Sequence, residues 1–305
     1  MHGAIDLGGT KIEAALLNAD LIPIKRQRID TPKDDYEQLL NAIQSQINWL
    51  RTTANDEQLS IGVGVPGVVD KKNGLTLTSN LPTKGRKLRQ DVSNLAGQDI
   101  PLENDCRCFA LSEANGGAGA GYKKIFGLII GTGIGGGICI DGKLSYGFNN
   151  LAAEVSHIPL PSTMVAKYNL PLLQCGCGRT ACYETFVAGP GLSRLAQHLA
   201  GVNLTAIEIA ARVEAGDKKM IHVLDVWVEL CSHMLDMIQL LVDPDCIILG
   251  GGISLIKNIE QKLLAGMKKV ALDNTHPPQL LLAKFGDSSG VRGAAMLPLL
   301  DNLEE

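Results

Sequence analysis

The stretch Asp6-Leu7-Gly8-Gly9-Thr10-Lys11 interrupts short runs of alternating apolar residues within residues 2–29. Alternation with a period of two predicts strands, and a compact Gly-rich turn joins them, so we expect a strand, a turn and a strand. The pattern returns between residues 126 and 140, where Gly131-Thr132-Gly133-Ile134-Gly135-Gly136-Gly137 separates two apolar runs. This recurrence predicts an internal duplication.

Both turns are small and rich in Gly and Thr. Their backbone N–H groups and hydroxyls suit phosphate oxygens, and Lys11 adds a positive charge to the first turn. The alternative is a pair of tight hairpin turns, in which Gly is simply the residue that best tolerates positive φ. Two such turns in mirrored positions favour a phosphate clamp between two lobes.

Apolar periodicity elsewhere in the chain predicts alternating helices and strands. We expect helices over 34–51, 88–97, 106–115 and 217–242, one after Gly250-Gly251-Gly252 and one beginning near Ser289, with strands at 61–65, 100–103, 246–249 and 279–284. The second half of the chain is expected to be mainly helical.

The composition is that of an ordinary globular protein. At 305 residues the chain is long enough for two domains, and its net charge of −4, without a basic run, argues against a nucleic-acid partner. No apolar stretch approaches the roughly 20 residues that cross a bilayer, and the N-terminus lacks a signal-peptide pattern. The eight cysteines suit a reducing compartment and a metal better than disulfides. We therefore expect a cytoplasmic protein with no membrane partner.

A zinc site is the most specific local signal. The spacing H-x17-C-x-C-x4-C offers one imidazole and three thiolates, which match a closed tetrahedral structural site formed by His157, Cys175, Cys177 and Cys182. The alternative is three buried cysteines that happen to cluster. Glu154 and Glu184 flank these ligands, so a bound metal would hold a loop that presents carboxylates.

Two nucleotide-binding patterns are excluded by context. Gly131-x-Gly133-x-x-Gly136 fits the dinucleotide fingerprint, which needs a following helix, whereas residues 137–143 continue as a strand and hairpin. The pattern G-x4-G-K-[ST] does not occur, so a triphosphate would not be bound by a P-loop.

The segment Glu103-Asn104-Asp105 lies between an expected strand and an expected helix. Asp105 there has two interpretations: a helix N-cap, or a general base that takes a proton from a substrate hydroxyl. Asn104, Glu154 and Glu184 add amide and carboxylate groups of the kind that a sugar requires. Residue types alone leave both interpretations of Asp105 open.

The chain as a whole resembles bacterial sugar kinases of the ROK family (repressors, open reading frames and kinases). The residues that carry the resemblance are Asp6–Lys11, Val65-Pro66-Gly67, Glu103-Asn104-Asp105, Gly131–Gly137, Glu154-x-x-His157, Cys175-Gly176-Cys177-Gly178 and Gly290-Val291-Arg292-Gly293-Ala294-Ala295. The resemblance implies an actin-like, ribonuclease-H-like α/β fold whose two lobes close over ATP and sugar. We place one lobe at 1–115 plus the helix at 289–305, and the other at 116–288.

The resemblance also implies roles for individual residues. Asp105 is the expected base. The residues expected to bind hexose are Gly67, Asn80, Asn104, Asp105, Glu154, His157 and Glu184. The residues expected near ATP and Mg²⁺ are Asp6, Gly8, Gly9, Thr10, Lys11, Thr132, Gly133, Gly135, Gly136, Gly251 and Gly252. His157 is expected to bind Zn²⁺ through one nitrogen and meet the sugar through the other. A homodimer is also implied.

Residues 78–88 and 126–130 are most similar to N-acetylglucosamine kinases, which implies ATP-dependent phosphorylation of the 6-hydroxyl of N-acetyl-D-glucosamine. Fructokinase, mannokinase and glucokinase remain alternatives within the family. A sugar-responsive transcriptional regulator is the alternative of another class. Such members carry an N-terminal helix-turn-helix domain, whereas here the first strand is expected from residue 2, so this alternative is disfavoured.

The sequence departs from the family pattern at three places near the expected site. Ser156 precedes His157 and Ala181 precedes Cys182 where Gly is usual, and Cys106-Arg107 stands where Ala-Asn is usual. An added Cβ restricts φ, so these departures bear on the geometry of the sugar loop and hence on substrate choice.

Overall fold

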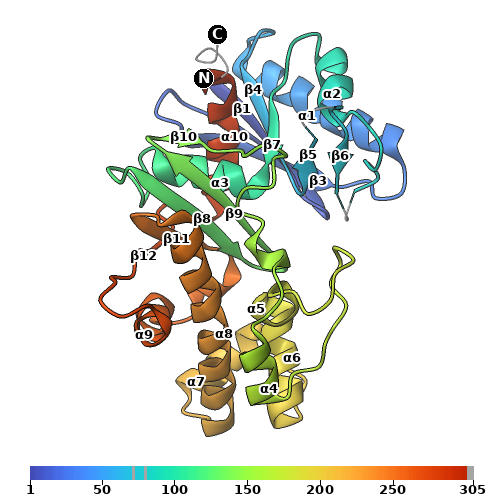
Figure 1. Ribbon diagram of the computed structural model, residues 1–305. Helices are drawn as coiled ribbons and strands as arrows, with labels where there is room; N and C mark the ends of the chain where they lie inside the picture. Colours follow the sequence, from blue (N-terminus) through green and yellow to red (C-terminus); the bar gives the residue numbers. More distant parts are fainter. Residues whose placement is uncertain (71–72, 79–80, 301–305) are drawn as a thin grey trace. The chain divides into compact units, whose positions relative to one another are not determined.

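The computed structural model describes residues 1–70, 73–78 and 81–300. Its strands and helices are interspersed in groups along the chain, as in an α/β protein (Figure 1). The strands are β1 (His2–Leu7), β2 (Lys11–Leu17), β3 (Pro23–Asp30), β4 (Ile61–Val65), β5 (Val68–Val69), β6 (Thr76–Leu77), β7 (Leu102–Asn104), β8 (Lys124–Ile130), β9 (Ile134–Ile140), β10 (Lys143–Leu144), β11 (Cys246–Gly250) and β12 (Gln279–Leu282).

The longer helices include α1 (Tyr36–Ala54), α8 (Lys218–Val242) and α10 (Ser289–Leu300). The other α-helices are α2 (Leu88–Ala96), α3 (Asp105–Ala114), α4 (Ser162–Tyr168), α5 (Glu184–Val187), α6 (Gly189–Ala200), α7 (Ala206–Glu214) and α9 (Ile259–Val270). Short 3₁₀ turns are η1 (Val155–His157), η2 (Gly252–Leu255) and η3 (Gly286–Ser288). Among the described helices, none is both long and apolar enough to cross a membrane.

Two five-stranded sheets share one plan. The first has the order β3-β2-β1-β4-β7 and the second β10-β9-β8-β11-β12, so each begins with consecutive strands and then adds later ones beside its first strand. In the first sheet β1, β4 and β7 are mutually parallel neighbours, and in the second β8, β11 and β12 are. This repetition agrees with the expected duplication and confirms the α/β class.

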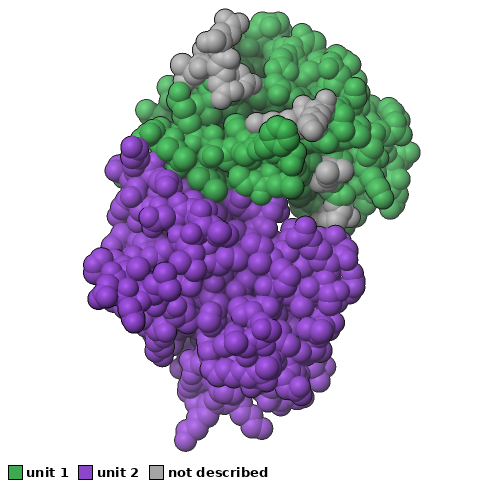
Figure 2. All heavy atoms as spheres, in the orientation of Figure 1, with its two compact units in different colours: residues 1–120, 137–152, 284–305 green, residues 121–136, 153–283 purple. Residues whose placement is uncertain are grey.

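The chain forms two compact units (Figure 2). Unit 1 is Met1–Ala120, Gly137–Ala152 and Lys284–Glu305, and unit 2 is Gly121–Gly136 and Ala153–Ala283. The lobe limits expected from the sequence, near residues 115 and 288, stay a prediction.

Close packing in the core of unit 1 requires glycine at two positions. α10 packs against α3, β4 and β1 so closely that a Cβ on Gly293 would lie 1.8 Å from the Cys108 carbonyl oxygen. A Cβ on Gly62 of β4 would lie 2.0 Å from the carbonyl oxygen of Ala294. Only glycine fits either position, so the Gly293-Ala294-Ala295 motif allows α10 to pack closely against the first sheet.

Candidate functional site

Parallel strands β1, β4 and β7 bring three expected site segments to one edge of the first sheet. Their register pairs Asp6 with Gly64 and Gly64 with Glu103. Because parallel strands end at the same edge, the turn after β1, the Pro66-Gly67 turn after β4 and the β7–α3 junction meet there. Unit 1 thus collects Asp6, Gly67, Asn104 and Asp105.

The cap of α3 is Asn104, so the structure settles which neighbour begins the helix. Asn104 has extended-type backbone angles (φ −58°, ψ 136°), and its Oδ1 accepts the N–H groups of Cys106 and Arg107 at 2.9 and 3.2 Å. Its Nδ2 donates to the Gly67 carbonyl oxygen at 2.8 Å. Both ends of the buried Asn104 side chain are therefore engaged with the protein.

Asp105 is the first helical residue rather than the cap. One of its carboxylate oxygens, Oδ1, also accepts the Cys106 N–H, at 2.8 Å. Burial raises the pKa of Asp105 above its usual value, and hydrogen bonds from the backbone act in the opposite direction. A carboxyl of this kind takes up a proton more readily than an ordinary aspartate.

Asp6 lies close to Asp105. A Cβ placed on Gly64 would be 3.9 Å from both Asp6 Oδ1 and the Cα of Asp105, so the two acidic residues border the same side of Gly64. Burial first, and then the charges of Asp105 and Glu13, raise the pKa of Asp6 to about 7. A pair of acids with a deficit of positive charge suits a cation.

The β1–β2 turn is held by its own backbone and by β3. Gly8 N–H donates to the Lys11 carbonyl oxygen at 3.0 Å, and Thr31 Oγ1 donates to the Gly8 carbonyl oxygen at 2.7 Å. Thr10 and Lys11 are both exposed, and the Lys11 ammonium forms an ion pair with Asp30. The structure therefore gives Lys11 a protein partner.

The corresponding edge of the second sheet carries two more glycine turns. β8 leads into Gly131-Thr132-Gly133 and β11 into Gly251, and the parallel register pairs Gly250 with Ile129. Gly251 has φ +79°, and a Cβ there would lie 2.5 Å from the Ile130 carbonyl oxygen, so the position requires glycine.

The expected glycines of the second turn differ in their surroundings. Thr132 and Gly133 are exposed, but a Cβ on the buried Gly136 would lie 2.8 Å from the Phe126 ring. Gly136 therefore serves packing under the turn, a role that glycine spacing alone did not reveal.

Four ligand atoms converge in unit 2. The ligand atoms of His157, Cys175, Cys177 and Cys182 all lie within 4.8 Å of one another. Cys175 Sγ is 3.7 Å from His157 Nδ1, and Cys177 Sγ is 3.7 Å from Cys182 Sγ. Ligands of a tetrahedral zinc ion, at about 2.3 Å for sulfur, lie about 3.8 Å apart, so the cluster has the dimensions and donor set of a zinc site.

The expected carboxylates of unit 2 border this cluster. Glu154 Oε2 lies 3.9 Å from His157 Nε2, the imidazole nitrogen opposite the cluster. Glu184 Oε1 is 3.9 Å from Cys175 Sγ, while its Oε2 accepts the Ile134 N–H at 3.0 Å. A hollow of about 250 Å³ lined in part by Thr132 and Glu184 joins the glycine turn to the Cys-rich loop.

The structure shows the surroundings of two residues that depart from the usual family pattern. Ser156 is fully buried, so its side chain is directed into the protein. Ala181 has φ +59°, the left-handed conformation in which glycine is favoured. Asn80, one of the expected hexose ligands, lies outside the described residues.

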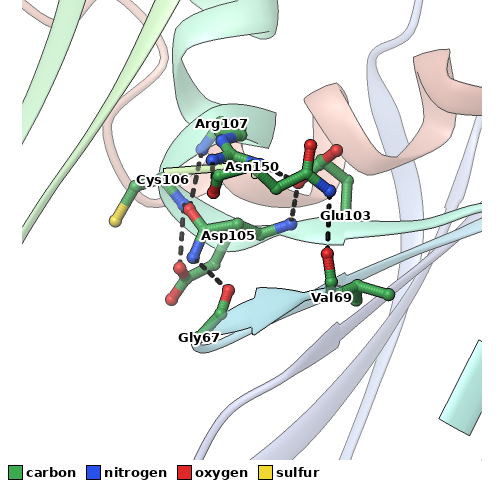
Figure 3. Close-up of polar contacts among 8 residues, drawn as sticks. Gly67, Val69, Glu103, Asp105, Cys106, Arg107 and Asn150 are labelled. Atoms are coloured by element: carbon green, nitrogen blue, oxygen red, sulfur yellow. Dashed lines mark hydrogen bonds and ion pairs between the residues drawn. The ribbon is translucent and has the colours of Figure 1, made fainter. Parts of the chain in front are cut away.

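Sequence reasoning missed a polar network behind Asp105. The buried guanidinium of Arg107 binds Glu103 and the carbonyl oxygen of Asn150, and Asn150 Nδ2 donates to the Val69 carbonyl oxygen at 2.8 Å (Figure 3). The unusual Arg107 was the available signal, but its partner is 43 residues away, and no local pattern identifies Asn150.

Comparisons with known proteins agree with this geometry. The family model described as "ROK family" matches residues 2–299. The N-acetylgalactosamine kinase AgaK of Shewanella sp. (strain ANA-3) is 39% identical over 298 residues, which cover 97% of this chain and 96% of that protein. The N-acetyl-D-glucosamine kinase of Photobacterium profundum is 38% identical over 300 residues, covering 97% of this chain and 99% of that protein.

A solved structure shows the same similarity in three dimensions. The crystal structure of a ROK family glucokinase from Streptomyces griseus, in complex with glucose and AMPPNP, superposes with a TM-score of 0.81 at 26% identity. The match covers 97% of this chain and 98% of that one.

Proposed function

This chain belongs to the ROK family, and on that premise we propose that it transfers a phosphoryl group from ATP to the 6-hydroxyl of N-acetyl-D-glucosamine. The observation that carries the proposal is the Asp105 carboxyl, which stands at the edge of the first sheet while its neighbour Asn104 caps the helix. The N-acetyl-D-glucosamine kinase that matches this chain over nearly its whole length supports the substrate.

Asp105 is the proposed general base. Its Oδ1 accepts the Cys106 N–H, and we assign the other carboxylate oxygen to the sugar 6-hydroxyl. As O6 attacks the γ-phosphorus, the hydroxyl proton passes to Asp105, the bond from the γ-phosphorus to the bridging oxygen breaks, and ADP leaves. The raised pKa of Asp105 strengthens it as a proton acceptor.

ATP with Mg²⁺ is the proposed phosphoryl donor, and the AMPPNP complex of the Streptomyces griseus glucokinase supports it. Asp6 fits the cation, because burial and the neighbouring acids make its carboxylate costly to ionise alone. Bound Mg²⁺ would neutralise charge on the phosphates. We propose that the phosphates are bound by the turn Gly8-Gly9-Thr10-Lys11, by Thr132 and Gly133 with Gly135, and by Gly251-Gly252. Gly136 would shape the turn that contains Thr132 and Gly133.

Zinc is the proposed occupant of the cluster of one histidine and three cysteines. With four protein ligands it leaves no open position for a substrate, so its role is structural. It would fix the loop beside which Glu154, His157 and Glu184 are placed, and we propose these three residues, with Gly67 and Asn104, as hexose-binding groups. Because both ends of the Asn104 side chain already have partners, we expect it to act mainly by holding the junction.

N-acetyl-D-galactosamine is a second candidate substrate. The relative that is 39% identical to this chain is an N-acetylgalactosamine kinase. The two sugars differ only in the configuration of the 4-hydroxyl, so both need a pocket for the acetamido group.

A substrate panel tests these assignments. ADP release would be measured with N-acetylglucosamine, N-acetylgalactosamine, N-acetylmannosamine, glucose, mannose and fructose. A site built around the acetamido group leaves polar groups unpaired when glucose binds, at about 1–3 kcal/mol each. We expect kcat/KM for N-acetylglucosamine at least about tenfold above glucose, equivalent to about 1.4 kcal/mol. A preference for fructose, mannose or glucose would overturn the substrate, and no hexose-dependent ADP would overturn the kinase.

We also propose a cytoplasmic location and a homodimer. Free cysteines throughout the described chain suit the reducing cytoplasm. The homodimer implied by family resemblance would appear in light scattering as twice the 32.5 kDa chain mass.

A further inference from the structure

Arg107 carries a positive charge in the interior of unit 1. Arg107 is only 2% exposed, although it lies in the first turn of α3, two positions after Asp105. A buried charge without a partner costs several kcal/mol, so its contacts must be strong enough to hold it there. Such a residue constrains whatever it binds.

The guanidinium makes two different connections. Nη1 donates to Glu103 Oε1 at 3.1 Å, which joins the helix to strand β7. Nη2 donates to the backbone carbonyl oxygen of Asn150, in the loop that follows β10 (Figure 3). The ring of Tyr146, from the same loop, lies 5.9 Å from the guanidinium carbon. Arg107 therefore ties the loop of residues 146–150 to β7, the strand that ends one residue before Asp105.

Asn150 extends this connection to a third segment. Its backbone is left-handed (φ +55°), and its Nδ2 donates to the Val69 carbonyl oxygen at 2.8 Å. Val69 follows Gly67 by two residues, and Gly67 is itself bound by Asn104. One guanidinium thus organises the β4–β5 turn, the β7–α3 junction and the loop after β10.

The tethered loop leads directly to proposed hexose ligands. Asn150 precedes Glu154 by four residues and His157 by seven. Through its bond to the Asn150 carbonyl, Arg107 fixes the chain shortly before the Glu154-x-x-His157 motif. The fork of a guanidinium suits this task, because it holds two acceptors at a fixed separation, which a lysine ammonium cannot do.

We propose that Arg107 is a positioning residue for the hexose, acting through the carbonyl of Asn150 and the carboxylate of Glu103 without touching the substrate. The inference rests on the proposed function, since it concerns the same sugar site. It assigns a role to a residue at which this chain differs from the usual family pattern.

The central variant is Arg107→Met, which keeps an unbranched chain and removes both donors. Because it removes the arginine from the Glu103 carboxylate, it is paired with the double variant Glu103→Gln/Arg107→Met, in which both charges of the ion pair are removed together. The double variant should fold even if the single one does not. Arg89→Met, which removes an exposed arginine paired with Asp99, is the matched control.

Two measurements separate this inference from the kinase proposal. Calorimetry without ATP gives the hexose affinity and tests the role of Arg107, whereas ADP release by the wild type tests the kinase activity. We expect both Arg107 variants to raise hexose Kd and KM at least tenfold, while the KM for ATP stays within twofold. Arg107→Lys should recover only part of the affinity, and Arg89→Met should match the wild type. Hexose Kd within twofold of wild type in the folded double variant, or equal increases in the KM of hexose and ATP, would overturn the proposal.

Discussion

Replacement of the proposed base tests the mechanism at a single atom. Asp105→Asn keeps the size of the side chain but removes its ability to take a proton. General-base catalysis contributes 10²–10⁴-fold, so we expect kcat to fall by about 10²-fold or more, equivalent to at least about 2.7 kcal/mol in the barrier. The KM for hexose should change much less, because the hydroxyl can still form a hydrogen bond.

The same variant has a predicted effect on stability. The pKa of Asp105 is raised in the folded protein, so between the ordinary value of 3.8 and the raised one the unfolded chain binds fewer protons. Ionisation of Asp105 therefore costs stability as pH rises. The neutral amide introduced by Asp105→Asn avoids that cost, and the unfolding free energy of the variant at pH 8 should equal or exceed that of the wild type.

The neighbouring cap supplies the matched control. Asn104→Ala removes the acceptor of two backbone N–H groups and should lower the unfolding free energy by about 1 kcal/mol. ADP release would give kcat and KM, and urea unfolding the free energy. Near-normal turnover in folded Asp105→Asn, or a loss of stability that matches Asn104→Ala, would refute the assignment of base and cap.

Three other outcomes follow from the site. Because the pKa of Asp6 is about 7, kcat/KM should fall as pH drops below about 7 and Asp6 becomes protonated, and the raised pKa of Asp105 acts in the same direction; a flat profile from about pH 5.5 to about 8.5 would contradict this. Metal analysis should find about one zinc per chain. Cys177→Ser should lose metal and hexose binding together, whereas full activity without zinc would remove the metal from the account. Ala181→Gly should raise the unfolding free energy by about 0.5 kcal/mol, because relief of the left-handed strain of about 1 kcal/mol exceeds the added entropy of the unfolded chain; urea unfolding that shows a loss would disprove the strain.

Elements with a strong periodic signal could be predicted from the sequence. The expected helix at 217–242 is α8 (Lys218–Val242), and the strand–turn–strand unit at the start is β1 and β2. β3 was not distinguished, because this edge strand is largely exposed and carries charged residues such as Lys25 and Arg28. A helix was expected directly after Gly252, but η2 intervenes and α9 begins at Ile259.

Parts of the site could also be predicted, where the chemistry lies in local spacing. The three cysteine ligands lie within the short segment 175–182, and the structure brings them together with His157, which precedes α4. The identity of the cap could not be predicted, since Asn104 and Asp105 are both good cap residues and only the backbone angles decide between them. The Arg107–Asn150 contact depends on how the loop after β10 folds back, which no local pattern encodes.

Analysis of which oxygen of the product carries the phosphate is the direct test of the proposed phosphorylation of the 6-hydroxyl. The wild-type protein would be incubated with N-acetyl-D-glucosamine, ATP and Mg²⁺, and the product examined by correlated ³¹P and ¹H NMR. We predict ADP and sugar phosphate in equal amounts, with the phosphorus coupled to the two protons on carbon 6. Phosphate on any other oxygen, or no sugar phosphate at all, would contradict it.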